Sequence, residues 1–163
     1  APSAVPLFPG ANVNLDPTRR EGVELRIKQS LSNTWSLQAT AQHVSPKFRE
    51  GENVGNEIPL VAKNTLSARL TWLPGDGRRA DVGWQAADSQ RYGNDFANTC
   101  STRIPRFDTL DARYAWRKEL WEFAIAGSNL TDKNYFSTAY GECRNGIYPD
   151  AGRLVQFTAR RAF

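Results

Sequence analysis

The chain has 163 residues, the length of one domain, and a net charge of +4. Its basic residues are scattered and form neither a basic helix nor a stacking module, so we do not expect nucleic acid as a partner. No run of about 18 apolar residues is present, which excludes a transmembrane helix. A membrane β-barrel stays compatible with the composition, because only alternate residues of its strands face lipid.

The N-terminal segment, residues 1–18, contains four of the nine prolines and is predicted to be a loop, with a short extended piece at residues 11–15. It lacks the charged and apolar segments of a signal peptide, so we expect that such a peptide was removed or that the protein starts further upstream. Strand-forming sequence begins at residue 19. We therefore divide the chain into an N-terminal loop or strand remnant, 1–18, and a strand region, 19–163.

Seven segments of the strand region alternate apolar and polar side chains with a period of two, as antiparallel β-strands do. In the third segment, Leu70 and Trp72 oppose Arg69 and Thr71, so one face is apolar and the other polar. Short turns are predicted at 30–34, 74–77 and 117–120, and long loops at 45–63, at 93–105 and before residue 146. The predicted strands are 19–29, 35–44, 64–73, 79–92, 106–116, one that begins at residue 121, and 151–163.

The alternation of short turns with long loops is how outer-membrane barrels are built. Aromatic residues crowd the predicted short turns, where they would form a girdle at one membrane interface. We therefore expect the apolar faces to point to lipid and the polar faces to a lumen. The alternative is a soluble lipocalin-like barrel or sandwich, in which the apolar faces point inward. The girdle residues are Trp35, Trp72, Trp116, Trp121 and Phe163.

Two cysteines, Cys100 and Cys143, lie in segments rich in Asn, Gly, Thr and Ser that are predicted to be loops on the same side of the barrel. We predict a disulfide between them, which requires an oxidising compartment. In the chain-entropy model, a bridge that closes a loop of this length contributes about 4 kcal/mol. Two free thiols are the alternative.

Signatures of catalysis are weak. The single histidine, His43, falls on the apolar face of its predicted strand, and carboxylate pairs such as Asp108 with Asp111 are expected in any polar lumenal lining. The sequence has no zinc-ligand spacing, Gly-rich phosphate loop or Cys–His nucleophile pattern. We predict neither an enzyme nor a bound cofactor.

The most specific motifs lie near the end of the chain. The polar kink Asn129-Leu-Thr-Asp-Lys-Asn-Tyr135 is followed by a loop, by Tyr148-Pro-Asp-Ala-Gly-Arg153, and by a strand that finishes on Phe163. Upstream stand Arg20-Glu-Gly-Val-Glu-Leu25 and Ile58-Pro-Leu-Val-Ala-Lys-Asn-Thr-Leu66. In this order the four motifs resemble the C-terminal end of TonB-dependent outer-membrane receptors, over roughly residues 19 to 163.

The resemblance implies an all-β, antiparallel transmembrane barrel in the outer membrane of Gram-negative bacteria. Such receptors are similar to a barrel of about 22 strands filled by an N-terminal plug, so this chain would be the last third. One alternative is a small self-contained barrel with an adhesin or structural role, its eighth strand drawn from residues 1–15; another is a soluble extracellular binding barrel. Phe157 and Phe163 match the closing-strand signal read by the barrel-assembly machinery, whereas Arg161 stands where an apolar or aromatic residue is expected.

The resemblance also implies uptake of a scarce nutrient, typically a ferric siderophore and sometimes cobalamin or haem. The expected partners are outer-membrane lipid, a siderophore or similar chelate, and TonB, which acts through a plug that this sequence does not contain. Asn129, Asp132 and Gly152-Arg153 match the family's pattern and are expected to shape the strand ends and loops, without touching cargo. Aromatic and cationic side chains in the long loops suit an anionic or aromatic chelate. These candidates are Arg91, Tyr92, Phe96, Arg103, Tyr140, Arg144 and Tyr148.

Overall fold

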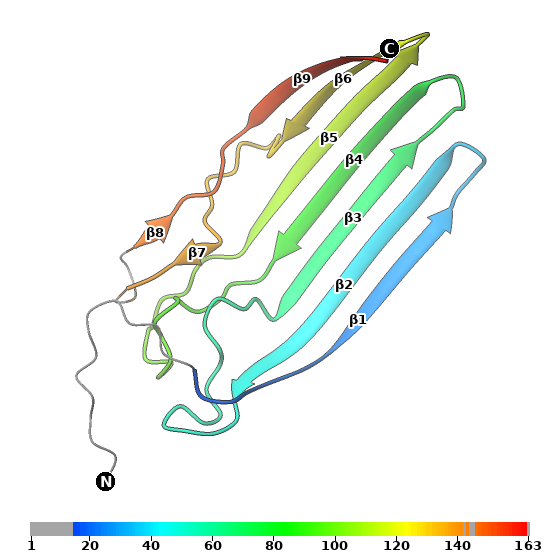
Figure 1. Ribbon diagram of the computed structural model, residues 1–163. Helices are drawn as coiled ribbons and strands as arrows, with labels where there is room; N and C mark the ends of the chain where they lie inside the picture. The colour runs from blue at the N-terminus through cyan, green and yellow to red at the C-terminus, as the bar shows by residue number, and fades with distance from the viewer. Residues whose placement is uncertain (1–14, 142, 144–145, 163) are drawn as a thin grey trace.

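The computed structural model describes residues 15–141, 143 and 146–162, which form one large antiparallel sheet and one small hairpin (Figure 1). The seven long strands are neighbours in chain order, from β1 at one edge to β9 at the other. This confirms the predicted seven-stranded antiparallel sheet. No helix in the described part of the chain is long and apolar enough to cross a membrane. The strands are β1 (Thr18–Ser30), β2 (Trp35–Phe48), β3 (Asn64–Trp72), β4 (Arg78–Ala87), β5 (Phe107–Lys118), β6 (Trp121–Ser128), β7 (Thr138–Ala139), β8 (Ile147–Tyr148) and β9 (Leu154–Arg161).

The register of the large sheet separates an apolar face from a polar one. Leu37, Leu70, Val82 and Ala112 are aligned across four strands. The neighbouring aligned row is polar except for one glycine and consists of Gln38, Arg69, Gly83 and Asp111. Large apolar side chains are exposed on the apolar face, among them Trp84, which is 38% exposed. The apolar face is therefore an outer surface and not a dry centre, as expected of strands that face lipid.

Ion pairs follow the polar face. Arg69 on β3 reaches over β4 to Asp111 on β5, with Nη2 and Oδ2 2.9 Å apart, and Arg79 Nε lies 2.8 Å from Asp81 Oδ2. Asp81 also accepts a hydrogen bond from the hydroxyl of Thr71 at 2.8 Å. A face with so many charges suits a water-filled or protein-filled lumen and does not suit lipid.

Strand β2 is longer than predicted, because it continues through Pro46 to Phe48. The backbone groups of residues 44, 46 and 48 face the loop between β2 and β3, because pairing with β3 has already stopped at His43 opposite Asn64. The missing N–H of Pro46 therefore costs no hydrogen bond in the β1–β2 ladder. The prediction of a loop from residue 45 is corrected to a loop that begins after Phe48.

Other boundaries also differ from the predicted ones. Strand β4 ends at Ala87, not at Tyr92, and the backbone beyond it forms a single bridge between Gln90 and Ile104. Strand β5 extends to Lys118, which shortens the turn before β6 to two residues. The hairpin β7–β8 was not predicted, and β9 starts at Leu154, three residues later than expected. The extended piece predicted at 11–15 and the terminal Phe163 lie outside the described residues, apart from Leu15.

Candidate ligand-binding loops

Three long connections pack on one another at the end of the sheet opposite the short turns (Figure 1). We call the described residues of 49–63, 88–106 and 129–153 the loop assembly. Backbone hydrogen bonds join its parts: Leu60 N–H donates to the Arg91 carbonyl at 3.1 Å, and Gly93 N–H donates to the Ala139 carbonyl at 2.8 Å. The three connections therefore form a single body.

The centre of the loop assembly is apolar. Ile104 and Ala139 are fully buried, Tyr92 is 5% exposed, and Leu60 and Phe136 pack against them. All three connections contribute residues to the cluster. Removing one connection would therefore expose apolar side chains of the other two. This is the largest buried apolar cluster that the described residues contain, because the sheet itself leaves its apolar face open.

Glu57 is the electrostatic centre of the loop assembly. Its two carboxylate oxygens lie 2.7 Å from Lys63 Nζ and 2.9 Å from Arg103 Nη2, and Arg91 Nε lies 3.6 Å away. Burial alone would raise the pKa of Glu57, but the hydrogen bonds and charges of Lys63 and Arg103 outweigh it and hold the pKa below its ordinary value. Glu57 is therefore ionised at neutral pH. Its hydrogen bond with Arg103, 46 residues further along the chain, joins the loop before β3 to the loop after β4.

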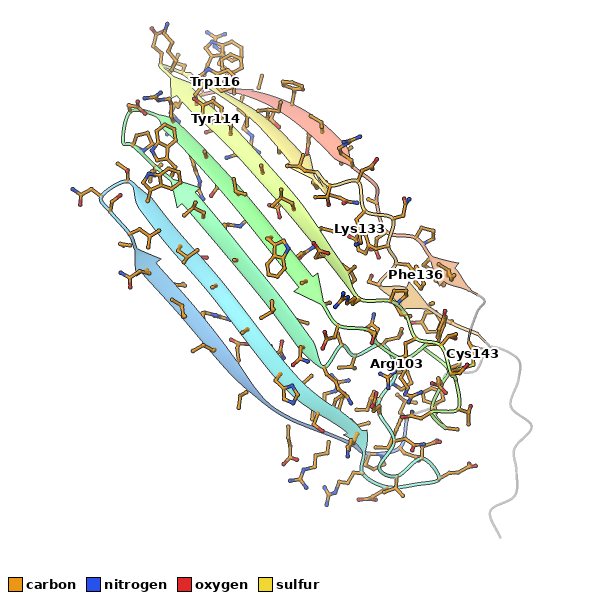
Figure 2. All side chains as sticks on the ribbon, turned by 180° about the vertical axis from the view of Figure 1, so that it is seen from behind. Arg103, Tyr114, Trp116, Lys133, Phe136 and Cys143 are labelled. Carbon is orange, nitrogen blue, oxygen red and sulfur yellow. A yellow bond between two sulfur atoms is a disulfide. The ribbon has the colours of Figure 1, made fainter. Side chains whose placement is uncertain are left out.

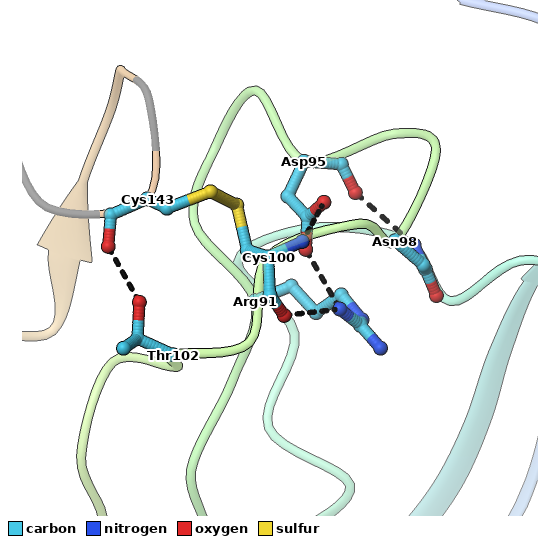
Figure 3. Close-up of a disulfide and its surroundings, with 6 residues drawn as sticks. All are labelled: Arg91, Asp95, Asn98, Cys100, Thr102 and Cys143. Atoms are coloured by element: carbon cyan, nitrogen blue, oxygen red, sulfur yellow. Dashed lines mark hydrogen bonds and ion pairs between the residues drawn. A yellow bond between two sulfur atoms is a disulfide. The ribbon is translucent and has the colours of Figure 1, made fainter.

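Asp95 connects the charge network to the disulfide (Figure 3). Arg91 Nη1 donates to one carboxylate oxygen of Asp95 at 2.7 Å, and the backbone N–H of Cys100 donates to the other at 3.1 Å. Cys100 is bonded to Cys143, as predicted, with Cα atoms 5.4 Å apart. The hydroxyl of Thr102 donates to the Cys143 carbonyl at 2.6 Å. The bridge thus joins the loop after β4 to the hairpin β7–β8.

The polar kink after β6 is built by Asn129, a residue that is 5% exposed and has a positive φ of 46°. Its amide nitrogen donates to the carbonyls of Lys133 and Ala151, and its amide oxygen accepts the Lys133 N–H at 2.9 Å. The Arg153 N–H donates to Asp132 at 3.2 Å. These contacts confirm the predicted structural role: they fix where β6 ends and where the chain returns to β9.

A hollow of about 460 Å³ lies on the polar face of the sheet, directly beneath the kink. Arg69, Asp111 and Gln156 line it from three strands, and Tyr135 borders it from the loop above. The ring of Tyr135 stacks on the ring of Phe107, with the two ring centroids 4.5 Å apart. The hollow therefore joins the loop assembly to the charged face of the sheet.

Sequence comparison decides the family. Residues 2–130 match the family described as "TonB dependent receptor-like, beta-barrel". The chain belongs to this family. Receptor barrels of this family lie in the outer membrane of Gram-negative bacteria.

Solved structures of receptor barrels have the same fold. The ferric yersiniabactin uptake receptor FyuA from Yersinia pestis is 21% identical, with a TM-score of 0.77 over 90% of this chain and 24% of its own length. The ferric citrate transporter FecA is 25% identical, with a TM-score of 0.75 over 87% of this chain and 24% of FecA. The copper transporter OprC is 20% identical, with a TM-score of 0.70 over 90% of this chain and 24% of OprC. This chain thus spans about a quarter of the length of these receptors.

The candidate ligand-facing residues that the structure describes fall into three groups: packed aromatics, exposed tyrosines and arginines of the Glu57 network. Tyr92 belongs to the apolar centre, and Phe96 packs edge-on against Phe48 with ring centroids 6.0 Å apart. Tyr140 and Tyr148 are exposed, 42% and 59%, and their rings meet at right angles with centroids 6.0 Å apart. Arg91 and Arg103 are held in the Glu57 network, and Arg144 lies outside the described residues.

Sequence reasoning missed the residues that organise the loop assembly. Glu57, Asp95 and Asn98 belong to no recognisable motif, and their contacts join segments distant in sequence. Asn98 donates from its amide to the Glu57 carbonyl at 3.0 Å and accepts the Glu57 N–H at 2.8 Å. The one available signal was the run of Asn, Asp and Gly between residues 93 and 98, whose side chains often bond the local backbone.

Proposed function

We propose that this chain is the C-terminal part of a TonB-dependent receptor that takes up a ferric siderophore. The observation that carries the proposal is the loop assembly: a disulfide-bridged body that presents exposed aromatic rings above a charged sheet face. The receptors FyuA and FecA share the fold, and both are named for ferric chelates. A rigid loop body is suited to ligand capture, because little conformational entropy is lost on binding.

The open sheet supports a larger barrel. Among the described residues, β1 and β9 pair only with β2 and β6, so each has an unpaired outer edge. Open edges do not occur in the hydrocarbon region, since no water is there to satisfy the backbone. Pairing with strands from elsewhere in the protein, in a barrel of about 22 strands, would satisfy both edges. A self-contained small barrel would need β1 to meet β9.

The ligand-facing surface that we propose combines the exposed pair Tyr140 and Tyr148 with the cationic side of the Glu57 network. Lys63, Arg91 and Arg103 face the two carboxylates Glu57 and Asp95, so one positive charge is in excess. An anionic chelate would be attracted by this charge and would stack on the tyrosine rings. Arg144 stays a candidate from the sequence.

Copper is a second cargo to consider, because OprC shares the fold. Direct coordination by this part of the receptor has no support: the described residues contain no group of three or more His, Cys, Asp or Glu side chains that could hold a metal ion. A chelate that carries its own iron ligands needs no such group. Cobalamin and haem are alternatives of the same kind, since both arrive with the metal already bound.

The remaining partners are proposals too. Lipid would contact the apolar face, where Phe157 is 77% exposed, and the barrel-assembly machinery would read the closing strand that contains it. TonB would act through a plug in the rest of the protein, with transport energy supplied by the inner-membrane proton gradient. The charged sheet face, with its Arg69–Asp111 pair, would line the lumen that the plug fills.

Calorimetry of the full-length receptor tests the cargo. We expect saturable binding of at least one ferric siderophore and no comparable binding of cobalamin, haemin or Cu²⁺. Tyr140→Ala and Tyr148→Ala should each weaken that binding, because stacking of the ligand on an aromatic ring is worth about 1 kcal/mol. Leu31→Ala, in the distant β1–β2 turn, is the matched control. Binding of only cobalamin, haemin or Cu²⁺ would overturn the siderophore proposal.

A further inference from the structure

Arginines gather on the polar face of the sheet at its short-turn end. Figure 2 shows this end of the sheet at Trp116, opposite the loop assembly that contains Arg103. On the polar face here, Arg117 of β5, Glu122 of β6 and Arg160 of β9 occupy one register row. The row therefore faces the proposed lumen and not lipid.

Glu122 is shared by the arginines around it and cannot neutralise them all. Arg117 Nη2 donates to Glu122 Oε2 at 3.0 Å, whereas Arg113 Nη2 lies 3.5 Å from Oε1. Arg160 has no ion pair with any described carboxylate, although its charge acts on Glu122. Each guanidinium carries five N–H donors. Arg113 and Arg160 are therefore able to bind a second carboxylate.

The other charges at this end leave the excess in place. Arg79 is paired with Asp81, so that pair is neutral. In the adjoining turns, Asp76 is paired with Arg78, and Glu119 is the other carboxylate. Even with Glu119 counted, one positive charge remains among the described residues of the polar face. The count sets Arg79, Arg113, Arg117 and Arg160 against Asp81, Glu119 and Glu122.

A hollow of about 310 Å³ lies beside these arginines. Arg113, Arg117 and Glu122 line it, and Gly77 of the β3–β4 turn borders it. The strand residue between the two arginines is Ala115, whose side chain is too small to fill the space. The hollow therefore has room for a side chain that comes from another segment.

We propose that Arg113 and Arg160, assisted by Arg117, bind the carboxylate of an Asp or Glu side chain on the receptor's own plug. The inference rests on the proposed function, in which this chain is one wall of a larger, plugged barrel. This chain spans about a quarter of FyuA and of FecA, so most of such a receptor lies outside it. Hydrogen bonds between guanidinium and carboxylate groups are charge-assisted, and the planar guanidinium matches the two carboxylate oxygens.

An acidic side chain suits this position better than lipid or cargo. Lipid contacts the apolar face, where Lys118 and Arg161 stand as the register partners of Trp121. The cargo is proposed to bind at the loop end, and a second firm site at the short-turn end would retain it in the lumen. A carboxylate of the plug supplies the missing negative charge and anchors the plug against β5 and β9.

Carbodiimide cross-linking of the full-length receptor tests the contact, because the reagent joins an amine to a carboxylate that lies against it. Arg113→Lys and Arg160→Lys keep the positive charge and each supply an amine at the proposed contact. We expect peptide mapping to find the introduced amine linked to an Asp or Glu encoded upstream of residue 1. Lys118, on the apolar face of β5, is the internal control and should form no such link.

Removal of the charges supplies a second measurement. The Arg113→Gln and Arg160→Gln double variant should speed hydrogen exchange in the plug about five-fold, as expected when a partly exposed ion pair is lost. Lys118→Gln is the matched control, since it removes a cation at the same end of the sheet but on the other face.

Three results would overturn the contact: links from positions 113 and 160 only to carboxylates of this chain, equal linking of Lys118 to the plug, or unchanged exchange in the double variant. A receptor that forms the expected link but binds no siderophore keeps the contact and rejects the siderophore proposal. A full-length sequence without a plug overturns the plugged barrel, and this inference with it.

Discussion

Arg91 and Asp95 form the most buried ion pair of the loop assembly, with Nη1 and Oδ2 2.7 Å apart and side chains that are 13% and 1% exposed. The same carboxylate accepts the backbone N–H of Cys100. The ion pair therefore fixes the position of Cys100, the first cysteine of the disulfide. Removing one partner of such a pair leaves a buried charge without compensation, which costs more than the pair itself contributes.

Asp95→Asn should loosen the loop after β4. The amide keeps the shape of the side chain but leaves Arg91 with only Glu57, at 3.6 Å, as a counter-charge. We expect a loss of about 3 kcal/mol in local stability, measured by hydrogen exchange of amides 88–106 in the purified receptor. Asp76→Asn is the control, because Asp76 is also paired with an arginine but stands in an exposed turn. Equal exchange in the two variants would contradict the prediction.

The disulfide should stabilise the loop assembly as a whole. Replacing both Cys100 and Cys143 by Ser frees a closed loop with a sequence separation of 43 residues. In the chain-entropy model the loss is about 4 kcal/mol, and it acts through the unfolded state. We expect faster proteolysis between residues 88 and 106 while the barrel strands stay protected. Peptide mapping without reductant should first find the two cysteines bridged; two alkylated thiols would refute the prediction.

Glu57 should make the loop assembly sensitive to acid. Its pKa in the folded protein lies below the ordinary 4.5, so its ionised form stabilises the fold above about pH 4.5 and this contribution is lost as the pH falls through the lower, folded value. The wild type should be better protected from hydrogen exchange than Glu57→Gln at pH 7, and the difference should shrink below about pH 4.5. A difference that grows with acid would mean that the sign is wrong.

Strands and faces could be predicted from the sequence, whereas the interior of the loop assembly could not. The alternation of Leu70 and Trp72 with Arg69 and Thr71 can be recognised within one strand. A strand with one buried or lipid-facing side needs apolar residues at every second position, so the pattern alone assigns its two faces. The end of β2 was missed because Pro46 normally interrupts pairing; it is tolerated here only because β3 has already stopped. Tyr92 has no local feature that separates a packed loop aromatic from an exposed one, since its neighbours Ile104 and Ala139 come from distant parts of the chain.

The two faces of β3 should differ in their tolerance of charge. Leu66→Lys places an ammonium group on the apolar face, well away from the girdle residue Trp72, where a cation near the middle of the bilayer costs about 2–4 kcal/mol. Ser67→Lys places the same group on the polar face of the same strand. We expect the first variant to reduce the amount of heat-modifiable receptor in the outer membrane, and the second to leave it unchanged. Equal amounts of folded receptor would show that the faces have been assigned wrongly.

Gly93 should control the position of Tyr140. A Cβ atom on Gly93 would lie 2.3 Å from the Tyr140 ring, so Gly93→Ala must push the ring away from the loop after β4. The ring can move, because it is 42% exposed, so we expect a stability loss of only about 1 kcal/mol. If Tyr140 contacts the siderophore, Gly93→Ala should weaken binding about as much as Tyr140→Ala. Asn94→Ala, at the neighbouring exposed residue, is the control, and siderophore affinity by calorimetry is the measurement. Full affinity in Gly93→Ala together with a loss in Tyr140→Ala would mean that the position of the ring in this structure is not the one that binds.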